Sequence, residues 1–245
     1  PFTWTLRDRE RILDLFEQVT GARLLYNYIW PGGLAHDLPP NFINKTIEFL
    51  DYFEPQIVEY NDLLTTNKIF IERSADVGVM PKEVAINYGV TGPSLRGSGI
   101  PFDLRKTEPY SIYDKFDFDV PVGEGQMGTV GDCWDRYYVR VLEMKESIKI
   151  LRQALAQIPE GDVQSAMPKK IRPKKGEVYS RYETARGDVG FYIRSDGKNV
   201  PTRLKMRSPA YCNLSVLNEI SAGWMISDVI TVLGSLDIVL GEIDR

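Results

Sequence analysis

The sequence predicts a mainly α-helical protein with a small antiparallel β insert, which is an α+β fold class. Apolar residues recur at spacings of three and four along most of the chain, but they alternate with polar residues between positions 177 and 207. A stretch rich in proline and lysine precedes the alternating part. We therefore expect a helical body at 1–158, a linker at 159–176, and a sheet with a carboxy-terminal helical segment at 177–245, packed with the body as one domain.

Two helices are expected in the first 65 residues. The first covers residues 5–20 and ends at Gly21, because glycine is favoured just after a helix. The second covers residues 41–65, where Pro55 is expected to cause a kink. Between them, residues 28–39 are rich in proline and glycine and predict a loop. The apolar face of the first helix is formed by Leu6, Ile12, Leu15, Phe16 and Val19.

The middle of the chain contains its clearest helix. A short helix is expected to start at Pro81, and residues 91–121 predict irregular structure with a strand-like stretch at 116–120. The long helix starts near Asp132, a good cap. Its apolar residues keep heptad spacing: Trp134, Tyr137, Val141, Met144, Ile148, Leu151, Leu155 and Ile158. This seam indicates a dimerising coiled coil or a long core helix, and we favour the core helix because only about three to four heptads are present.

Strands and short helices are expected after the linker. The predicted strands cover 177–184, 188–195 and 202–207, with a turn at 195–199, and the predicted helices cover 214–220 and 227–233.

The composition excludes several classes of function. The chain has 245 residues, 43% apolar and 26% charged, and its formal net charge of −4 disfavours a general nucleic-acid surface. Cys133 and Cys212 fit no metal-ligand spacing and favour a reducing cytoplasm, and His36 is the single histidine, so we expect no metal site. No run reaches the ~18–20 apolar residues of a membrane span. The opening without methionine is expected of a fragment or a processed chain.

Two glycine-rich segments match nucleotide-binding patterns only in part. Residues 123–128 have the spacing G-x-G-x-x-G, but Pro121 interrupts the approach and the helix is expected to begin after the glycines. We therefore favour a flexible loop and expect no bound nucleotide or flavin. Residues 91–99 lack the Gly-Lys-Ser/Thr ending of a P-loop, which favours a tight crossing where backbone meets backbone.

Charged side chains form three local groups. The alternating charges of residues 7–11 are typical of a solvated helix face. Asp103 and Arg105 predict a buried ion pair with a structural role. A basic cluster in the linker indicates a solvated segment or a contact to an acidic neighbouring subunit, and it comprises Lys169, Lys170, Arg172, Lys174 and Lys175.

The carboxy-terminal segment, residues 234–245, is an apolar run with acids inside it. An unpaired carboxylate at Asp237 would be costly there, so this group must be paired, protonated or solvated by a cavity. Arg245 offers a permanent cation. Two roles follow for the acid: part of a functional site, or a structural ion pair that anchors the chain end.

Blocks of sequence throughout the chain resemble one protein family. They lie at 9–11, 17–23, 28–33, 37–39, 89–99, 103–110, 131–147, 176–177, 195–197 and 235–245. Together these blocks are similar to the D subunit of the NADH–quinone oxidoreductase of respiratory complex I, in its carboxy-terminal part, and this family is a distant relative of the [NiFe] hydrogenase large subunits. The similarity covers nearly all 245 residues and preserves the order of every block.

The resemblance implies a fold and a role. The fold would be that of this complex I family and of the hydrogenase large subunit. The chain would be a peripheral-arm subunit of a proton-pumping NADH–quinone oxidoreductase, a translocase of the respiratory chain. It would form part of the quinone pocket, beside the subunit with the terminal iron–sulfur cluster and the membrane-arm subunit at the quinone site. FMN, NAD and iron–sulfur clusters would belong to other subunits, and the complex would lie at the cytoplasmic face of the bacterial inner membrane, with this chain held there peripherally through its partners.

The resemblance also implies site residues. No catalytic, cofactor-binding or metal-binding residue is expected in this chain, and the isolated fragment is expected to be inactive. The quinone-pocket neighbourhood would contain Phe2, Asp237, Val239, Glu242 and Arg245. The family's histidine, tyrosine and aspartate nearest the headgroup precede the point that matches Pro1, so His36 is not that histidine.

Two departures from the pattern leave two rival interpretations. The linker at 159–176 is shorter than usual, and no cysteine follows Cys212, which removes the nickel ligands of hydrogenases. One rival is a hydrogenase-like large subunit that lacks the nickel ligands. Two Cys-x-x-Cys pairs would favour a hydrogenase, and none is present. The other is a scaffold with no chemistry of its own.

Overall fold

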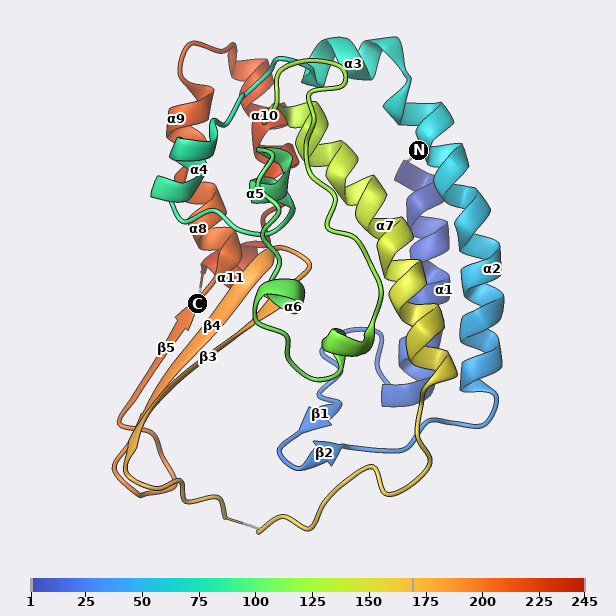
Figure 1. Ribbon diagram of the computed structural model, residues 1–245, viewed down its shortest axis with the longest axis vertical. Helices are drawn as coiled ribbons and strands as arrows, with labels where there is room; N and C mark the ends of the chain where they lie inside the picture. The colour runs from blue at the N-terminus through green and yellow to red at the C-terminus, as the bar shows by residue number, and fades with distance from the viewer. Residues whose placement is uncertain (1, 169, 245) are drawn as a thin grey trace. The chain divides into compact units, whose positions relative to one another are not determined.

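The computed structural model describes residues 2–168 and 170–244, and these are mainly α-helical with a two-stranded and a three-stranded antiparallel sheet (Figure 1). The predicted fold class is therefore confirmed. Contacts within the chain divide it into two compact units. Unit 1 comprises Pro1–Leu64 and Ser147–Ile171, and unit 2 comprises Thr65–Glu146 and Arg172–Arg245.

Unit 1 is built on two helices, α1 (Phe2–Thr20) and α2 (Phe42–Tyr60), together with the last part of α7 (Cys133–Ala156). Helix α1 begins three residues before the predicted start, and Gly21 follows it with a φ of 73°, as a C′ glycine should. Of the predicted apolar face only Leu15 is buried. Phe16 is exposed on a cavity of about 590 Å³ that Tyr26, Tyr28 and Leu38 also line.

The loop predicted at 28–39 contains a small hairpin. Strand β1 (Ile29–Trp30) pairs with β2 (Gly33–Leu34) in the register Ile29↔Leu34. The turn between them depends on Gly32 and Gly33, whose φ values are 94° and 147°. The rest of 28–39 is irregular, as predicted, and the two strands were missed because a two-residue strand leaves no periodicity to detect.

The second predicted helix also differs from its expectation at the carboxy-terminal end. Helix α2 contains Pro55 as predicted, but regular α-helix ends at Tyr60 and one turn of π-helix, η1 (Asn61–Thr65), follows.

The buried acid of unit 1 is Asp8, which is 1% exposed on α1. Its carboxylate accepts hydrogen bonds from Tyr52 at 2.7 Å, from Tyr60, and from Arg7 Nε at 2.9 Å. Burial alone would raise the pKa of Asp8, but the hydrogen bonds from Arg7, Tyr60 and Tyr52 outweigh it and hold this pKa below its usual value. The expected solvated face of residues 7–11 is thus interrupted by a buried, paired acid, which joins α1 to α2.

Unit 2 contains the remaining helices and the larger sheet (Figure 1). Its helices are α3 (Lys68–Ser74), α4 (Lys82–Asn87), α5 (Pro93–Gly97), α6 (Leu104–Thr107), the 3-10 turn η2 (Tyr113–Lys115), the first part of α7, α8 (Pro209–Ser215), α9 (Leu217–Ser221), α10 (Ile226–Leu236) and α11 (Leu240–Ile243). Helix α4 starts one residue after Pro81, as expected. The expected strand at 116–120 is absent, and residues 91–121 hold α5, α6 and η2 where irregular structure was predicted.

The three-stranded sheet agrees with its prediction. Strands β3 (Gly176–Thr184), β4 (Gly187–Ser195) and β5 (Arg203–Arg207) lie in the order β3-β4-β5, and both pairs are antiparallel. The register pairs Tyr179 with Tyr192, and Tyr192 with Lys205. The alternation in the sequence was sufficient because the strands are consecutive hairpins.

Helix α7 starts at Cys133, where Asp132 caps it by accepting a hydrogen bond from the Asp135 amide at 2.8 Å. It ends at Ala156, so Ile158 of the predicted seam lies beyond the helix. Residues outside the seam are also buried, including Val139 at 0% and Ile150 at 9% exposure. Burial on more than one face agrees with the core-helix interpretation rather than a coiled coil.

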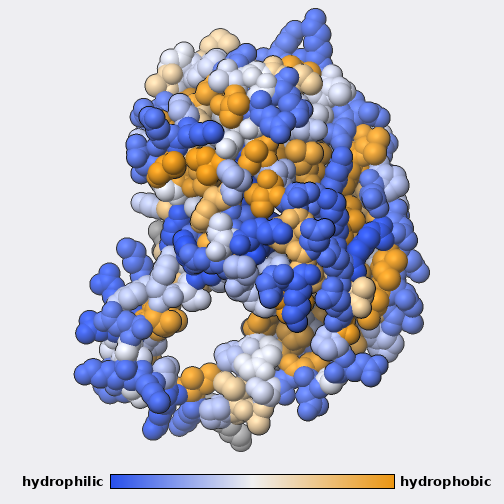
Figure 2. All heavy atoms as spheres, viewed as in Figure 1, coloured by the Kyte–Doolittle hydropathy of each residue, from blue (hydrophilic) through white to orange (hydrophobic). Residues whose placement is uncertain are grey.

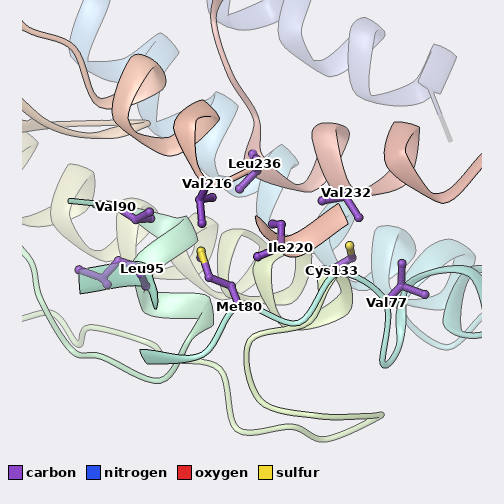
Figure 3. Packing of buried hydrophobic residues seen from close by; sticks show 10 residues of the cluster. Val77, Met80, Val90, Leu95, Cys133, Val216, Ile220, Val232 and Leu236 are labelled. Atoms are coloured by element: carbon purple, nitrogen blue, oxygen red, sulfur yellow. The ribbon is translucent and has the colours of Figure 1, made fainter. Parts of the chain in front are cut away.

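The hydrophobic core of unit 2 brings together the start of α7, the loop before α4, and helices α9 and α10 (Figure 3). Cys133, Val216, Val232 and Leu236 are each at most 2% exposed. The labelled side chains in Figure 3 converge from these elements, which fixes the carboxy-terminal helices on α7. The single helix predicted at 214–220 corresponds to parts of two helices, α8 and α9, which are separated at Val216. Helix α8 begins earlier than predicted because Ser208 caps it by accepting a hydrogen bond from the Tyr211 amide.

The glycine-rich run at 91–99 is a backbone crossing, as predicted. A Cβ on Gly92 would lie 2.4 Å from the Arg186 carbonyl oxygen and 2.6 Å from the Gly187 Cα. Residues 123–128 form a loop, but the expectation that it is flexible is wrong. The Gly123 amide donates to the Arg96 carbonyl at 2.8 Å, and the Gly125 amide donates to Asp135 at 3.0 Å.

Among the described residues, no helix is both long enough and apolar enough to span a membrane.

Candidate functional site

The carboxy-terminal segment of unit 2 turns sharply at Asp237. Helix α10 carries its apolar side chains inward, with Val232 and Leu236 buried, and ends where Asp237 adopts a left-handed conformation with φ 52° and ψ 52°. The Asp237 amide still donates to the Gly234 carbonyl at 3.2 Å. A left-handed non-glycine residue is uncommon, and aspartate tolerates it better than most. The turn directs the Asp237 side chain away from the axis of α10 and towards two arginines.

Asp237 is paired with those two arginines. Arg186 Nη2 lies 3.3 Å from Oδ1, and Arg140 Nε lies 3.6 Å from Oδ2. Arg186 Nε also donates to the Asp237 carbonyl oxygen at 3.4 Å. The Asp237 side chain is 39% exposed, so the acid is not deeply buried. Of the alternatives that the sequence left open for this carboxylate, the structure selects pairing.

Arg140 is the more buried of the two arginines, on α7. Burial lowers the pKa of Arg140 to about 10, and Asp237 and Glu143 oppose that shift. Its Nη1 donates to the Arg136 carbonyl, and its Nη2 donates to Ser94 Oγ at 3.4 Å. The Nε has no hydrogen-bond partner among the described residues, since 3.6 Å to Asp237 is an ionic contact only. This leaves the cluster with one unsatisfied buried donor.

Ser94 closes the cluster from α5. Its hydroxyl donates to the Leu236 carbonyl at 3.4 Å and receives the hydrogen bond from Arg140. We call Ser94, Arg140, Arg186 and Asp237 the Asp237 cluster. It joins α5, α7, the β3–β4 turn and the end of α10, all within unit 2.

Glu242 has different partners from Asp237. Its Oε2 accepts a hydrogen bond from Ser208 Oγ and another from the Ala210 amide, both at 3.3 Å, so it holds α11 against the start of α8. Glu242 also lines a cavity of about 220 Å³ together with Phe191, Met206 and Arg207. Val239 is half-buried and precedes α11.

The structure thus places Asp237, Val239 and Glu242 on one short segment, but in separate polar environments. Phe2 is 75% exposed at the start of α1 and belongs to unit 1. Arg245 lies outside the described residues. The grouping of all five in one pocket neighbourhood stays a prediction.

A second polar network lies beside this cluster. Arg96 on α5 is 2% exposed and contacts Glu143 at 2.5 Å and Glu183 at 3.0 Å, with Asp103 at 3.7 Å. Arg105 binds Asp103 at 2.6 Å, which confirms the predicted buried pair. Burial raises the pKa of Glu183 despite Arg96, whereas hydrogen bonds from Arg105 overcome burial and lower the pKa of Asp103.

The third buried cation, Arg136, has no contact with a carboxylate among the described residues. It is 0% exposed, and its Nε donates to Ser235 Oγ at 2.9 Å. Its two terminal nitrogens donate to the carbonyls of Gly131 and Gly78, at 2.5 and 2.9 Å, and one also contacts Cys133 Sγ at 3.2 Å. Burial lowers the pKa of Arg136. All three guanidinium nitrogens have partners, so this arginine fixes α10 to α7.

Sequence reasoning missed Arg186, which pairs with Asp237, and Ser94, which accepts a hydrogen bond from Arg140. Arg140 fell within a block of family resemblance, yet nothing in its spacing connected it to an acid 97 residues away. One local signal was available: Arg136, Arg140 and Glu143 repeat at spacings of four and three on α7. Charged residues at helical spacing on a core helix predict a buried polar stripe.

The polar side chains of the Asp237 cluster are one carboxylate, two guanidiniums and one hydroxyl. Among the residues that the structure describes, no group of three or more His, Cys, Asp or Glu could hold a metal ion. What the site offers is a carboxylate between two guanidiniums, partly open to solvent. Such a group can hold or release a polar ligand.

These features define a mainly helical α+β protein with an arginine–carboxylate cluster at its carboxy-terminal segment. A family model described as the 49 Kd subunit of respiratory-chain NADH dehydrogenase matches residues 1–175 and 165–245, and the chain belongs to this family. Its fold is accordingly that of the hydrogenase large subunit and its complex I relatives.

Individual relatives agree with this assignment. The chain is 53% identical to the D subunit of NADH-quinone oxidoreductase from Chlorobium phaeovibrioides over 249 aligned residues, and 53% identical to that from Chlorobaculum tepidum. It is 52% identical to the corresponding protein of Pelodictyon phaeoclathratiforme. Each alignment covers 100% of this chain but only 62% of the relative. The chain therefore spans less than two thirds of the length of these relatives.

Proposed function

We propose that the chain is part of a quinone-reducing, proton-translocating NADH dehydrogenase and contributes the Asp237 cluster to the wall of its quinone pocket. Electrons would pass from an iron–sulfur cluster on a neighbouring subunit to quinone, with FMN and NAD also on other subunits. The chain would be held peripherally at the membrane, on the cytoplasmic side, through those partners. Family membership and the names of the relatives support this role.

The observation that carries the proposal is the state of the Asp237 cluster. A purely structural ion pair is expected to satisfy its buried donors, yet Arg140 Nε is left without a hydrogen bond among the described residues. Asp237 itself is 39% exposed and held in a left-handed conformation. A paired but accessible carboxylate can exchange its arginine contacts for contacts to a polar headgroup at small desolvation cost.

A second role, anchoring of the chain end, is favoured by the ion pairs themselves. Arg186 and Arg140 hold Asp237 at 3.3 and 3.6 Å, and this alone fixes the end of α10. The pocket role and the anchoring role differ in what happens when the acid is removed.

Substitutions in the assembled complex separate the two roles. Asp237→Ala and Val239→Met are made in the full-length subunit, and quinone reductase activity and inhibitor sensitivity are measured per assembled complex. The matched control is Asp228→Ala, because Asp228 is also an acid of α10, 4% exposed and paired with Arg73 at 3.1 Å. The pocket role predicts reduced turnover or altered inhibitor response for Asp237→Ala and Val239→Met, but not for the control. Normal turnover and inhibitor response with less assembled complex, for Asp237→Ala as for the control, would establish anchoring instead.

A further inference from the structure

The three-stranded sheet presents a basic face that the proposed quinone site does not use. Residues 176–207, which contain the three strands, hold seven lysines and arginines against four aspartates and glutamates, a net charge of +3 in a chain whose total is −4, and of these cations only Arg186 belongs to the Asp237 cluster. In Figure 2, hydrophilic residues gather around the outer part of β3–β5. A charge segregated in this way marks a surface for an oppositely charged partner.

A cavity of about 440 Å³ opens on this face, between the sheet and α8. Because side chains alternate along a strand, the paired residues Tyr179, Tyr192 and Lys205 point to the same side of the sheet, and all three line the cavity. Tyr211 and Cys212 close it from α8. The absence of a side chain at Gly190 leaves room for Tyr179, because a Cβ at Gly190 would lie 2.2 Å from the Tyr179 hydroxyl oxygen.

The cations at this cavity differ in how they are used. Arg207 is committed to the fold, because it donates to the carbonyls of Asp188 and Gly89. Lys205 and Arg203 are exposed, and among residues 2–168 and 170–244 no hydrogen bond or ion pair holds either side chain. Two free cations beside aromatic walls leave binding capacity for a carboxylate.

We propose that this basic face docks an acidic segment of a neighbouring protein chain, with a carboxylate of that segment bound to Lys205 in the tyrosine-lined cavity. The exposed cations continue along β5 from Lys205 to Arg203, which does not line the cavity, so an extended acidic segment fits better than a single small ligand. Tyrosines are typical of the central residues of protein interfaces, and Lys205 adds an exposed cation beside them that can meet a carboxylate of the partner. The proposal rests on the proposed function, because the neighbour is sought in the assembled complex.

Zero-length coupling tests the contact directly. A carbodiimide joins a lysine amine to a carboxylate only when the two touch, and mass spectrometry of the treated complex then identifies both residues. We expect an amide between Lys205 Nζ and an aspartate or glutamate of another chain. Lys205→Arg keeps the charge but cannot couple, so the complex should assemble normally and this cross-link should vanish.

Accessibility provides a second readout. Lys205 acetylation and Cys212 alkylation should both be slower in the complex than in the free chain, whereas Lys115, an exposed lysine of unit 2 that does not line the cavity, should react alike in both. Lys205→Glu should weaken association by about 30-fold or more, and Lys115→Glu should leave it unchanged.

Each contrary result has a distinct meaning. A complex that contains the chain but leaves Lys205 uncoupled and as reactive as Lys115 would overturn the docking surface alone. Binding of Lys205 to phosphatidylglycerol vesicles, with no cross-link to protein, would overturn it in favour of a membrane surface. A full-length subunit that never copurifies with the complex would overturn both this inference and the proposed function.

Discussion

Removing Arg96 should destabilise the protein far more than removing any surface arginine. Arg96 is 2% exposed, and it is the cation shared by Glu143 at 2.5 Å and Glu183 at 3.0 Å. It also donates to the Phe102 carbonyl at 2.9 Å. The variant Arg96→Met keeps most of the side-chain volume but leaves Glu183, which is 3% exposed, without its cation. Breaking a buried ion pair in this way costs about 3–5 kcal/mol of unfolding free energy.

The magnitude can be checked against an exposed arginine with a similar partner set. Arg152 contacts Asp51 at 2.8 Å and Glu54 at 3.0 Å, but the side chains are 38%, 62% and 61% exposed. Solvent screens such pairs, so Arg152→Met should cost less than about 1 kcal/mol. Urea unfolding monitored by circular dichroism gives both values under the same conditions.

The pH dependence of the stability lost in Arg96→Met tests whether the buried network acts as one unit. Burial already raises the pKa of Glu183 above its usual value, so the folded state binds a proton more readily than the unfolded state. Stability contributed by this group therefore falls as pH rises through that range, and loss of Arg96 should extend the effect to higher pH. The deficit of Arg96→Met should shrink as pH is lowered below neutral and should be largely removed by adding Glu183→Gln. A deficit no larger than that of Arg152→Met, or one unaffected by Glu183→Gln, would show that the network is not a coupled buried unit.

Three further outcomes are expected. Gly92→Ala should lose about 2–3 kcal/mol of stability, because Gly92 has a φ of 72° and a ψ of −153° and a Cβ there would meet the Arg186 carbonyl. Gly234→Ala, in helix α10 with nothing within 4 Å of the added Cβ, should instead gain up to about 1 kcal/mol, and thermal melts that show the same sign for both variants would contradict this. Asp8→Asn should cost about 1–3 kcal/mol of stability at pH 7. Because the folded pKa of Asp8 lies below its usual value of 3.8, the stability difference between the variant and the natural chain should disappear as pH falls below that value, and a difference that persists in acid would refute the role of the charge. The isolated chain should bind a hydrophobic dye and self-associate, since Ile69, Ile226 and Ile230 are 73%, 88% and 73% exposed; a monomer at high concentration without dye binding would contradict it.

Local patterns in the sequence were sufficient to predict those elements whose contacts are close together along the chain. The sheet could be predicted because alternation in 177–207 is resolved into consecutive hairpins, and the start of α7 could be predicted because Asp132 caps the helix that follows it. Helix α3 was missed although Asn67 caps it, its side chain accepting from the amides of Ile69 and Phe70. That signal was present, but a seven-residue helix has too few turns for periodicity to reveal it.

Long-range partners could not be predicted in the same way. Asp237 was identified as an acid that needed a partner, but Arg186 lies 51 residues away on a turn between strands, and no spacing rule connects them. The backbone crossing at Gly92 was predicted from glycine content, whereas its partner, the 186–187 turn, was visible only in the structure. Pairing across the fold depends on packing that a local pattern does not encode.

The polar stripe of α7 explains why these separate networks act on one segment. Arg136 binds Ser235, Arg140 pairs with Asp237, and Glu143 pairs with Arg96, so successive turns of one helix hold the end of α10 and helix α5. Arg136 has a partner for each of its nitrogens, and Arg96 has carboxylates on both sides. Of the three arginines, Arg140 alone keeps an unsatisfied donor among the described residues. A helix that is held firmly on both sides of one incomplete pair keeps that pair in place without completing it. A ligand that offers a hydrogen-bond acceptor can then complete it instead.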